Sequence, residues 1–239
     1  MNAAELYQAG RPEEAIKALG DGLRDDPTDV RRRTFLFELL CFMGEYERAE
    51  KQLDILAKSG RDAEAGTLLY RGALHAERIR QGMFGPGGLL PSTSEPRTVP
   101  GTLNGKPFTS LVDADPRIGA RLEVFAAGQY TWLPLEHVSS MTMEAPRRVR
   151  DLLWSPVTVR PSENMRQLEL GELLMPVTTP GAWRHSDPLV RLGRVTEVEE
   201  LPNGGPLVPV GQKLFLVDDD EIPVLEIREL LITPVAEKA

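Results

Sequence analysis

The first part of the chain repeats its apolar residues at the three- and four-residue spacing of amphipathic helices. This pattern predicts helices over 3–9, 13–24, 29–43, 45–58 and 62–81. The last of them carries a broad apolar face made of Ala65, Leu68, Leu69, Ala73, Ala76 and Ile79. We therefore expect residues 1–84 to be helical.

These helices contain a repeat with a period of 34 residues. Its first copy is marked by Tyr7, Gly10, Ala15 and Leu19, and its second copy by Cys41, Gly44, Ala49 and Leu53. The period is that of tetratricopeptide repeats, which are pairs of antiparallel helices. Glycine suits the tight turn inside each pair because it accepts positive φ without a steric cost. The small alanines let the paired helices approach closely, so we predict a tetratricopeptide-like domain over 1–84.

The prolines divide the chain. Of the twenty, only Pro12 and Pro27 lie in 1–84, and the other eighteen lie in 85–239. Since proline inside a helix costs about 3 kcal/mol, the second part is mostly not helical. A stretch rich in proline, glycine and serine over 85–101 is typical of a connector. The predicted division is therefore a helical domain, this connector and a second domain over 102–239.

Beyond the connector the pattern changes to short, strand-like stretches. They predict strands over 108–113, 122–125, 130–134, 138–143, 169–176, 190–198, 213–217 and 222–230, with turns at 126–129 and at 203–205. Pro146 suits the first turn of one short helix that ends at Trp154. The predicted fold class is α+β, with a tetratricopeptide-like helical domain followed by a mostly antiparallel, β-rich domain.

Composition narrows the function classes. The 28 basic and 36 acidic residues give a net charge of −8, which argues against a general nucleic-acid binder. The single cysteine, Cys41, excludes an internal disulfide. No apolar run approaches the roughly 20 residues that span a bilayer, so no membrane partner is expected. The N-terminus lacks the basic and apolar segments of a signal peptide, and we expect a cytoplasmic protein.

The residues that usually carry chemistry are scattered. His75, His137 and His185 show no metal-ligand spacing, and Cys41 lies in an apolar helical stretch where a thiol is inert. The segment 101–107 has too few residues between its glycines for a phosphate-binding loop. We expect no metal and no cofactor.

Asp113 and Asp115 are the most prominent acidic pair. Their segment resembles a calcium loop but places Arg117 where an acceptor is needed. We favour a structural interpretation in which the two aspartates cap a turn and pair with Arg117 or Arg121. A small hydrolase that uses the two aspartates as its acid pair is the enzymatic alternative.

The three tryptophans allow two interpretations. Trp132 and Trp154 are core residues by the usual burial of tryptophan, or they line a peptide groove, since aromatic anchors dominate interface energy. Trp183 is flanked by glycine, alanine and charged residues, and we expect it to be exposed.

The second domain also carries a series of motifs. They read Asn104-Gly105-x-x-Phe108, Asp113-x-Asp115-x-Arg117-x-Gly119, Tyr130-x-Trp132-x-Pro134, Arg150-Asp151-x-x-Trp154, Gly171-Glu172 and Leu192-Gly193-Arg194. In this order, after two tetratricopeptide-like units and a connector, the chain resembles the TagJ/ImpE family. These proteins, also called SciE-type, are accessory components of bacterial type VI secretion systems.

The resemblance implies a cytoplasmic protein without catalytic activity. It implies that the chain binds the small subunit of the contractile sheath, TssB, through an N-terminal helix of that subunit. It further implies a link to sheath assembly or to disassembly driven by the ATPase ClpV. The family has no catalytic residue to carry over to this chain.

The motif residues could serve in a groove that binds the partner helix or in the structure of the second domain. We expect Trp132, Trp154 and Trp183 to contact the partner, with Arg150 and Arg194 as charges at the rim. A structural motif is expected from Asp113, Asp115, Arg117, Glu123 and Asp151, with the Arg150–Asp151 pair reaching groups such as Glu123. A general tetratricopeptide chaperone that holds some other peptide stays an alternative function.

Overall fold

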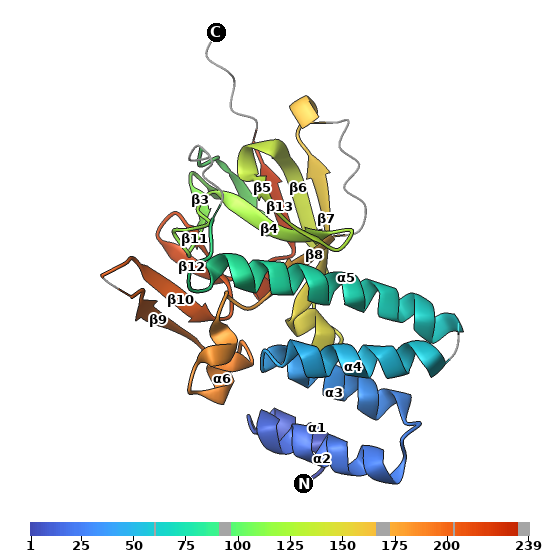
Figure 1. The fold of residues 1–239 in the computed structure, drawn as a ribbon. Helices are drawn as coiled ribbons and strands as arrows, with labels where there is room; N and C mark the ends of the chain where they lie inside the picture. The colour runs from blue at the N-terminus through green and yellow to red at the C-terminus, as the bar shows by residue number, and fades with distance from the viewer. Residues whose placement is uncertain (60, 91–96, 166–172, 203, 234–239) are drawn as a thin grey trace.

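The computed structural model describes residues 1–59, 61–90, 97–165, 173–202 and 204–233. Its first part is a series of antiparallel helices (Figure 1). They are α1 (Ala3–Gln8), α2 (Pro12–Asp25), α3 (Val30–Phe42), α4 (Tyr46–Leu56) and α5 (Arg61–Phe84), with a short 3-10 helix, η1 (Ala57–Ser59), before α5. All five predicted helices are confirmed, with ends that differ by a few residues.

The repeat has the predicted geometry. Ala15 and Ala49 are completely buried where the helices of each pair meet. Gly10 and Gly44 have φ values of 72° and 68°, which L-residues rarely adopt. An Asn2–Glu5 capping box starts the first helix by pairing backbone N–H groups that the helix leaves open.

The second part is built on an eight-stranded antiparallel sheet with the order β2-β1-β13-β6-β7-β8-β4-β5. In that order the strands are Lys106–Phe108, Gly101–Leu103, Glu229–Ile232, Val138–Met143, Trp154–Pro161, Leu173–Pro176, Arg121–Ala126 and Gln129–Pro134. A three-stranded sheet joins β3 (Leu111–Asp113), β11 (Leu214–Val217) and β12 (Asp220–Pro223). The strands β9 (Thr196–Glu200) and β10 (Leu207–Gly211) form a separate two-stranded ribbon.

Two predictions for this part are wrong. Trp154 does not end a helix but begins strand β7, after a short 3-10 helix, η3 (Val149–Leu152). The predicted strand over 190–198 instead holds helix α6 (Pro188–Arg191), because Asp187 caps the helix and Pro188 takes its first position. Strand β9 starts only at Thr196.

Other predicted β elements are partly confirmed. The stretch 222–230 is divided by a 3-10 helix, η6 (Val224–Glu226), between β12 and β13. The strands β1, β7 and β10 were not predicted, and β2 was predicted only at Phe108. Strand β1 begins at Gly101, the last residue of the predicted connector. The first residues of the predicted strand 169–176, and Asn203 in the predicted turn, lie outside the described residues.

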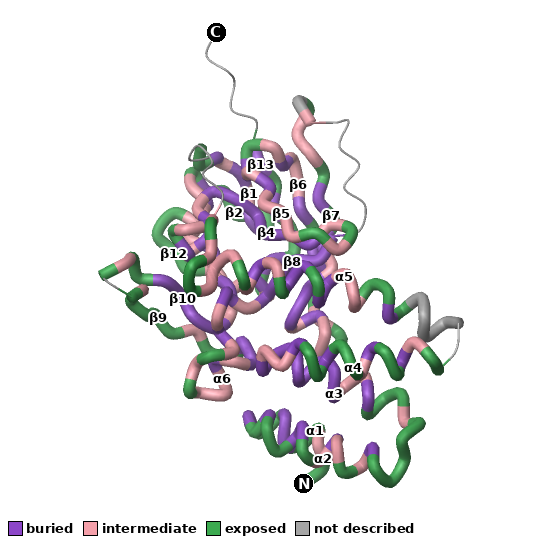
Figure 2. The backbone as a smooth tube through the Cα atoms, viewed as in Figure 1, coloured by how far each residue is buried: buried purple, intermediate pink, exposed green. Residues whose placement is uncertain are grey.

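The helices and the sheet share a core. One face of the sheet packs on an apolar cluster of its own, which includes Leu122, Val157 and Met175. On the opposite face, Phe125, Trp154 and Leu174 belong to the same buried cluster as the helices. Helix α5 lies along this second face (Figure 1), and the tube in Figure 2 is buried where the two parts meet. Among the described helices none is both long and apolar enough to cross a membrane.

Candidate functional site

Helix α5 is attached to the sheet by a buried ion network. The Arg80 side chain is completely buried, and its guanidinium donates to both oxygens of Glu123 in β4, over 2.8 and 3.0 Å. It also donates to Glu77 on its own helix, over 3.2 Å, and to the carbonyl of Thr178, over 3.0 Å. Such a bidentate pair fixes both distance and orientation, so it sets how the helix lies on the sheet.

Lys213 completes the network from the other side. Its ammonium contacts the carboxylates of both Asp113 and Glu123, and all three side chains are buried. Burial opposes ionisation of Glu123, but the charges of Arg80 and Lys213 outweigh it and lower the Glu123 pKa. Burial raises the pKa of Asp113, although Lys213 opposes this shift. The predicted pairing of the Arg150–Asp151 motif with Glu123 is therefore wrong, because Arg80 and Lys213 occupy that carboxylate.

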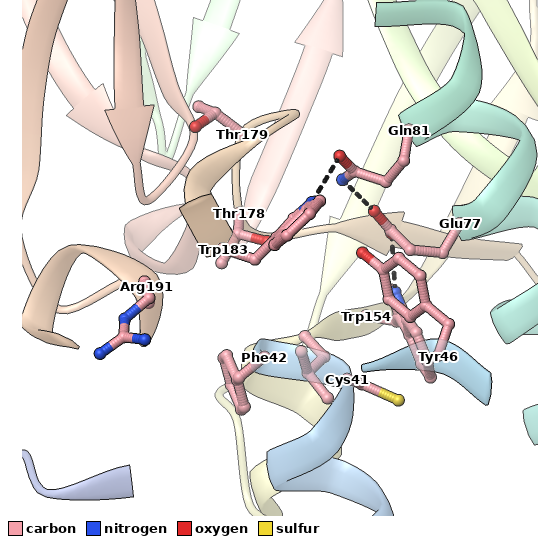
Figure 3. A pocket seen from close by; sticks show the side chains of 11 residues that line it. Cys41, Phe42, Tyr46, Glu77, Gln81, Trp154, Thr178, Thr179, Trp183 and Arg191 are labelled. Atoms are coloured by element: carbon pink, nitrogen blue, oxygen red, sulfur yellow. Dashed lines mark hydrogen bonds between the residues drawn. The ribbon is translucent and has the colours of Figure 1, made fainter. Parts of the chain in front are cut away.

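Hydrogen bonds connect all three tryptophans to helix α5, two of them directly (Figure 3) and Trp132 through other side chains. Trp154 is 3% exposed and donates its indole N–H to Glu77 over 3.0 Å. Trp183 donates to Gln81 over 3.2 Å. Trp132 donates to the hydroxyl of Tyr130, which in turn donates to Glu123. Their intramolecular partners make them anchors between the helices and the sheet.

Trp183 is half-buried, so its predicted exposure is wrong. Its ring lies over Gly44, the turn glycine of the second repeat, and a Cβ at that position would overlap the ring. The equivalent Gly10 of the first repeat lies under Leu189, 2.7 Å from where its Cβ would be. Both repeat turns thus need glycine for close approach as well as for φ.

Arg194 also binds within the chain. Its guanidinium donates to the carbonyls of Gln8 and Tyr7, over 2.9 and 2.8 Å, at the C-terminal end of α1. It lies 4.5 Å from the centre of the Tyr7 ring. A cation suits this end of a helix because the last carbonyls have no partner in the helix. The predicted rim charge is therefore a contact between the two parts of the chain.

Arg150 and Asp151 belong to η3, which contacts helix α3 and places Arg150 beside Tyr70 of helix α5. The Arg150 guanidinium lies 5.7 Å from the centre of the Tyr70 ring. Asp151 accepts from the backbone N–H groups of Arg147 and Arg148, over 2.9 and 3.0 Å, which fixes the turn of η3. This side of the repeat helices is therefore filled by η3 and by Trp154.

The acidic pair has the predicted structural role. Asp113 accepts from the backbone N–H of Asp115 over 2.9 Å, and Asp115 accepts from the backbone and guanidinium of Arg117. Both aspartates are buried. The cavity beside Glu77 and Trp154 (Figure 3) measures about 10 Å³, room for one water at most. No group of three or more metal-ligating side chains occurs among the described residues. A hydrolase needs carboxylates that the substrate and a water molecule can reach. Asp113 and Asp115 are buried and bonded to other groups, so they do not form such a pair.

A larger depression lies on the exposed part of the sheet, next to the helices. Its floor is a row of paired residues across three strands, Glu229, Thr142 and Thr158. Its rim includes Glu144 and Arg147 from the segment that leads to η3. The groove has a volume of about 900 Å³. Thr158 alternates with Val157 and Val159 and points to the same face as Trp154, so this open space lies on the part of the helix-bearing face beyond the helices.

Comparisons with known proteins agree with this architecture. The family model described as ImpE protein matches residues 105–231, more than half of the chain. The chain belongs to the ImpE family. A tetratricopeptide repeat model matches residues 6–71. The type VI secretion system accessory component TagJ of Pseudomonas aeruginosa is 32% identical, over 98% of this chain and 92% of that protein.

The fold of this ImpE-family chain also occurs in a crystal structure. A protein from Vibrio parahaemolyticus, 21% identical, matches with a TM-score of 0.84 over 97% of both chains. At this identity the match shows the fold alone. The matched region includes both the helices and the sheet, so the two structures share the arrangement of these parts.

Two residues that hold this ImpE-family fold together, Arg80 and Lys213, were not predicted. Arg80 follows Ala73 and Ala76 on the buried side of α5. A charged residue on the apolar face of a predicted helix was the feature of the sequence that could have pointed to it. Lys213 stands in an apolar stretch before β11, but nothing local indicates which carboxylate it meets. Its partner Asp113 is a hundred residues away in the sequence.

The stability of the folded protein is expected to depend on pH through Glu38, a buried residue of helix α3. Burial raises the pKa of Glu38 to about 7, although the charge of Arg150 opposes the shift. Between about pH 4.5 and pH 7 the folded protein then holds a proton that the unfolded chain has released. The free energy of unfolding should fall by up to about 3 kcal/mol as the pH rises through this window. Urea denaturation at a series of pH values measures this slope.

Glu38→Gln is the matched control because its amide stays neutral. The variant should lose the part of the slope due to Glu38 and exceed the parent in stability at pH 8. Equal slopes in the two proteins would contradict the assigned shift.

Proposed function

We propose that this ImpE-family chain is a non-enzymatic adaptor of a type VI secretion system. It acts in the cytoplasm by binding the N-terminal helix of the small sheath subunit TssB, and thereby modulates assembly of the sheath or its disassembly by ClpV. The observation that carries the proposal is the similarity to TagJ, an accessory component of such a system, over 98% of the chain. The buried and paired carboxylates support a role without catalysis.

The groove on the sheet is the binding site that we propose for this helix. The inner side of the repeat helices is occupied by η3 and by Trp154, which packs 6.3 Å from Phe37 between ring centres. A volume of about 900 Å³ lies in the upper part of the range of about 300–1,000 Å³ that ligand pockets have. Pro156, which is partly exposed, and Ala145, which is exposed, offer apolar contacts in the groove. A helix that lays its apolar face there would use the helix-in-groove mode.

Charged side chains at the rim suit the polar flanks of such a helix. Arg147 and Glu144 are both more than four-fifths exposed, and Arg228 and Glu229 face them from the start of β13. Opposite charges on a partner helix would fix its direction and register more than its affinity. The groove therefore supports a specific orientation for an amphipathic helix.

Calorimetric titration with a synthetic peptide of the cognate TssB N-terminal helix tests the proposal. We expect saturable binding near one peptide per chain, lost when the apolar face of the peptide is made polar. Thr158→Trp should weaken binding at least tenfold, because Thr158 is exposed on the groove floor and the indole fills the space. Thr28→Trp, at an exposed turn far from the groove lining, is the matched control.

Absence of binding by the parent protein would contradict the proposed function. Equal binding by the parent and by Thr158→Trp would contradict the groove as its site. A general tetratricopeptide chaperone is less well supported, since the face that would hold its peptide is covered by the chain itself. The same peptide panel distinguishes the two, because an adaptor prefers the sheath helix over unrelated helices.

A further inference from the structure

Strand β9 forms an uncovered edge on the periphery of the molecule (Figure 1). It pairs with β10 alone, and four of its five residues are exposed. Val198 is 63% exposed in its middle. The side of β9 away from β10 therefore faces solvent.

The register shows which backbone groups this edge presents. Facing residues in an antiparallel pair alternate between those that exchange hydrogen bonds and those that do not. Gly211 uses both its N–H and its carbonyl for Thr179, so it cannot bond its facing residue Thr196. Pro209, two residues earlier, has no N–H and faces Val198. By this alternation Thr196, Val198 and Glu200 direct their N–H and carbonyl groups away from β10, to the free edge.

Three other strand edges are closed. Strand β2 carries Pro107, which lacks an N–H, and β5 lies against helix α5. In β3 the N–H groups of Leu111 and Asp113 bond to Thr98 and Gly119. The edge of β9 has neither a proline nor a covering helix, so it differs from them.

The side chains of β9 select the kind of strand that could join it. Glu197 and Glu199 point to one face, where both contact the His185 imidazole over 3.5 and 3.4 Å, and each is still about half exposed. Val198 points to the other face, where it forms an apolar patch with Leu207 of β10, also 63% exposed. A second copy of β9 would place glutamates opposite glutamates, which destabilises pairing. A strand with basic residues opposite the glutamates and an apolar residue opposite Val198 would complement both faces.

We propose that β9 is a strand-addition site for an extended segment of a partner protein in which basic residues alternate with apolar ones. The backbone groups of Thr196, Val198 and Glu200 supply the hydrogen bonds, and Glu197 and Glu199 supply the charge selection. This site is separate from the groove on the large sheet and does not depend on the proposed function.

A fluorescent peptide in which lysine alternates with valine is the probe, followed by anisotropy on the full chain. We expect saturable binding that is lost when the valines are N-methylated, because the valines face the three residues that present backbone groups. A peptide of the same composition with its lysines and valines in separate blocks should bind at least tenfold more weakly. Equal binding of the three peptides would show that charge attraction alone holds them, which would overturn the proposal. Absence of binding by the alternating lysine–valine peptide would overturn it as well.

Two variants place the binding on β9. Val198→Pro removes an N–H from the free edge and leaves the bonds of Glu197 and Glu199 to β10, so at least tenfold weaker binding is expected. Joint replacement of both glutamates by lysine should abolish binding of the lysine peptide and permit binding of its glutamate counterpart. Glu136→Lys, at an exposed site on another element, is the control for charge and should change affinity less than threefold. Unchanged affinity in Val198→Pro, or a dimer of the parent protein that this variant dissociates, would overturn the proposal.

Discussion

Replacing Arg80 with alanine is expected to destabilise the protein by about 3–5 kcal/mol, because it leaves buried carboxylates without their counter-charge. Arg80 is completely buried and pairs with Glu123 and Glu77. Neither carboxylate gains access to water when the guanidinium is removed, since both residues are also buried. Urea denaturation followed by circular dichroism measures the loss.

Arg78→Ala is the matched control, two residues away on the same helix. Arg78 pairs with Glu47 and Glu50 over 3.3 and 3.1 Å, but its side chain is 41% exposed. Exposed pairs of this kind contribute about 0–1 kcal/mol. If the two variants lost similar free energy, the buried network would not be what holds α5 on the sheet.

Replacing Trp154 with alanine is expected to cost about 3–5 kcal/mol, the range for deletion of a large buried aromatic side chain. The Trp154 ring packs between Phe37 of the helices and Phe125 of the sheet, 6.3 and 6.4 Å away between ring centres. Its loss leaves a cavity and takes the indole donor from Glu77. Thermal and urea unfolding measure the change.

Trp154→Phe separates these two effects, since it keeps most of the ring and removes the N–H. It should cost about 1–3 kcal/mol, the cost of leaving a buried polar group without its partner. An unchanged melting temperature in Trp154→Ala, together with lost peptide binding, would instead make Trp154 a contact for the partner.

The helical part could be predicted closely because its signals are local. The repeated glycines and alanines report turns and close contacts within a few residues of themselves. Pro12 and Asn2 mark helix starts by their own chemistry. In such a region spacing, capping and packing all favour the same structure.

The β part could be predicted less well because its pairing is long-range. Strand β7, which was not predicted, contains Pro156 and Pro161, and proline is rare inside a sheet. Tertiary packing of Trp154, Val157 and Val159 outweighs that local preference. The strands β1 and β13 pair although more than a hundred residues separate them, and no local pattern gives that partner.

Several residues predicted to contact a partner protein have partners within the chain instead. The family motifs that contain Trp132, Trp154 and Arg194 do mark a contact surface, but that surface joins the two parts of the chain. Sequence alone does not separate an aromatic anchor for a partner from an anchor for another part of the same chain. The burial of the side chain distinguishes the two, and that burial depends on how α5 lies on the sheet.

Hydrogen–deuterium exchange of the full chain, with and without the TssB helix peptide, tests most directly whether the partner helix binds outside the helix–sheet junction. We expect slower exchange over 142–147, 156–158 and 228–229, which line the groove, and unchanged exchange in α3. Faster exchange in α3 and η3 on peptide binding would contradict this, because the peptide would then enter by displacing the chain's own Trp154 and Arg150.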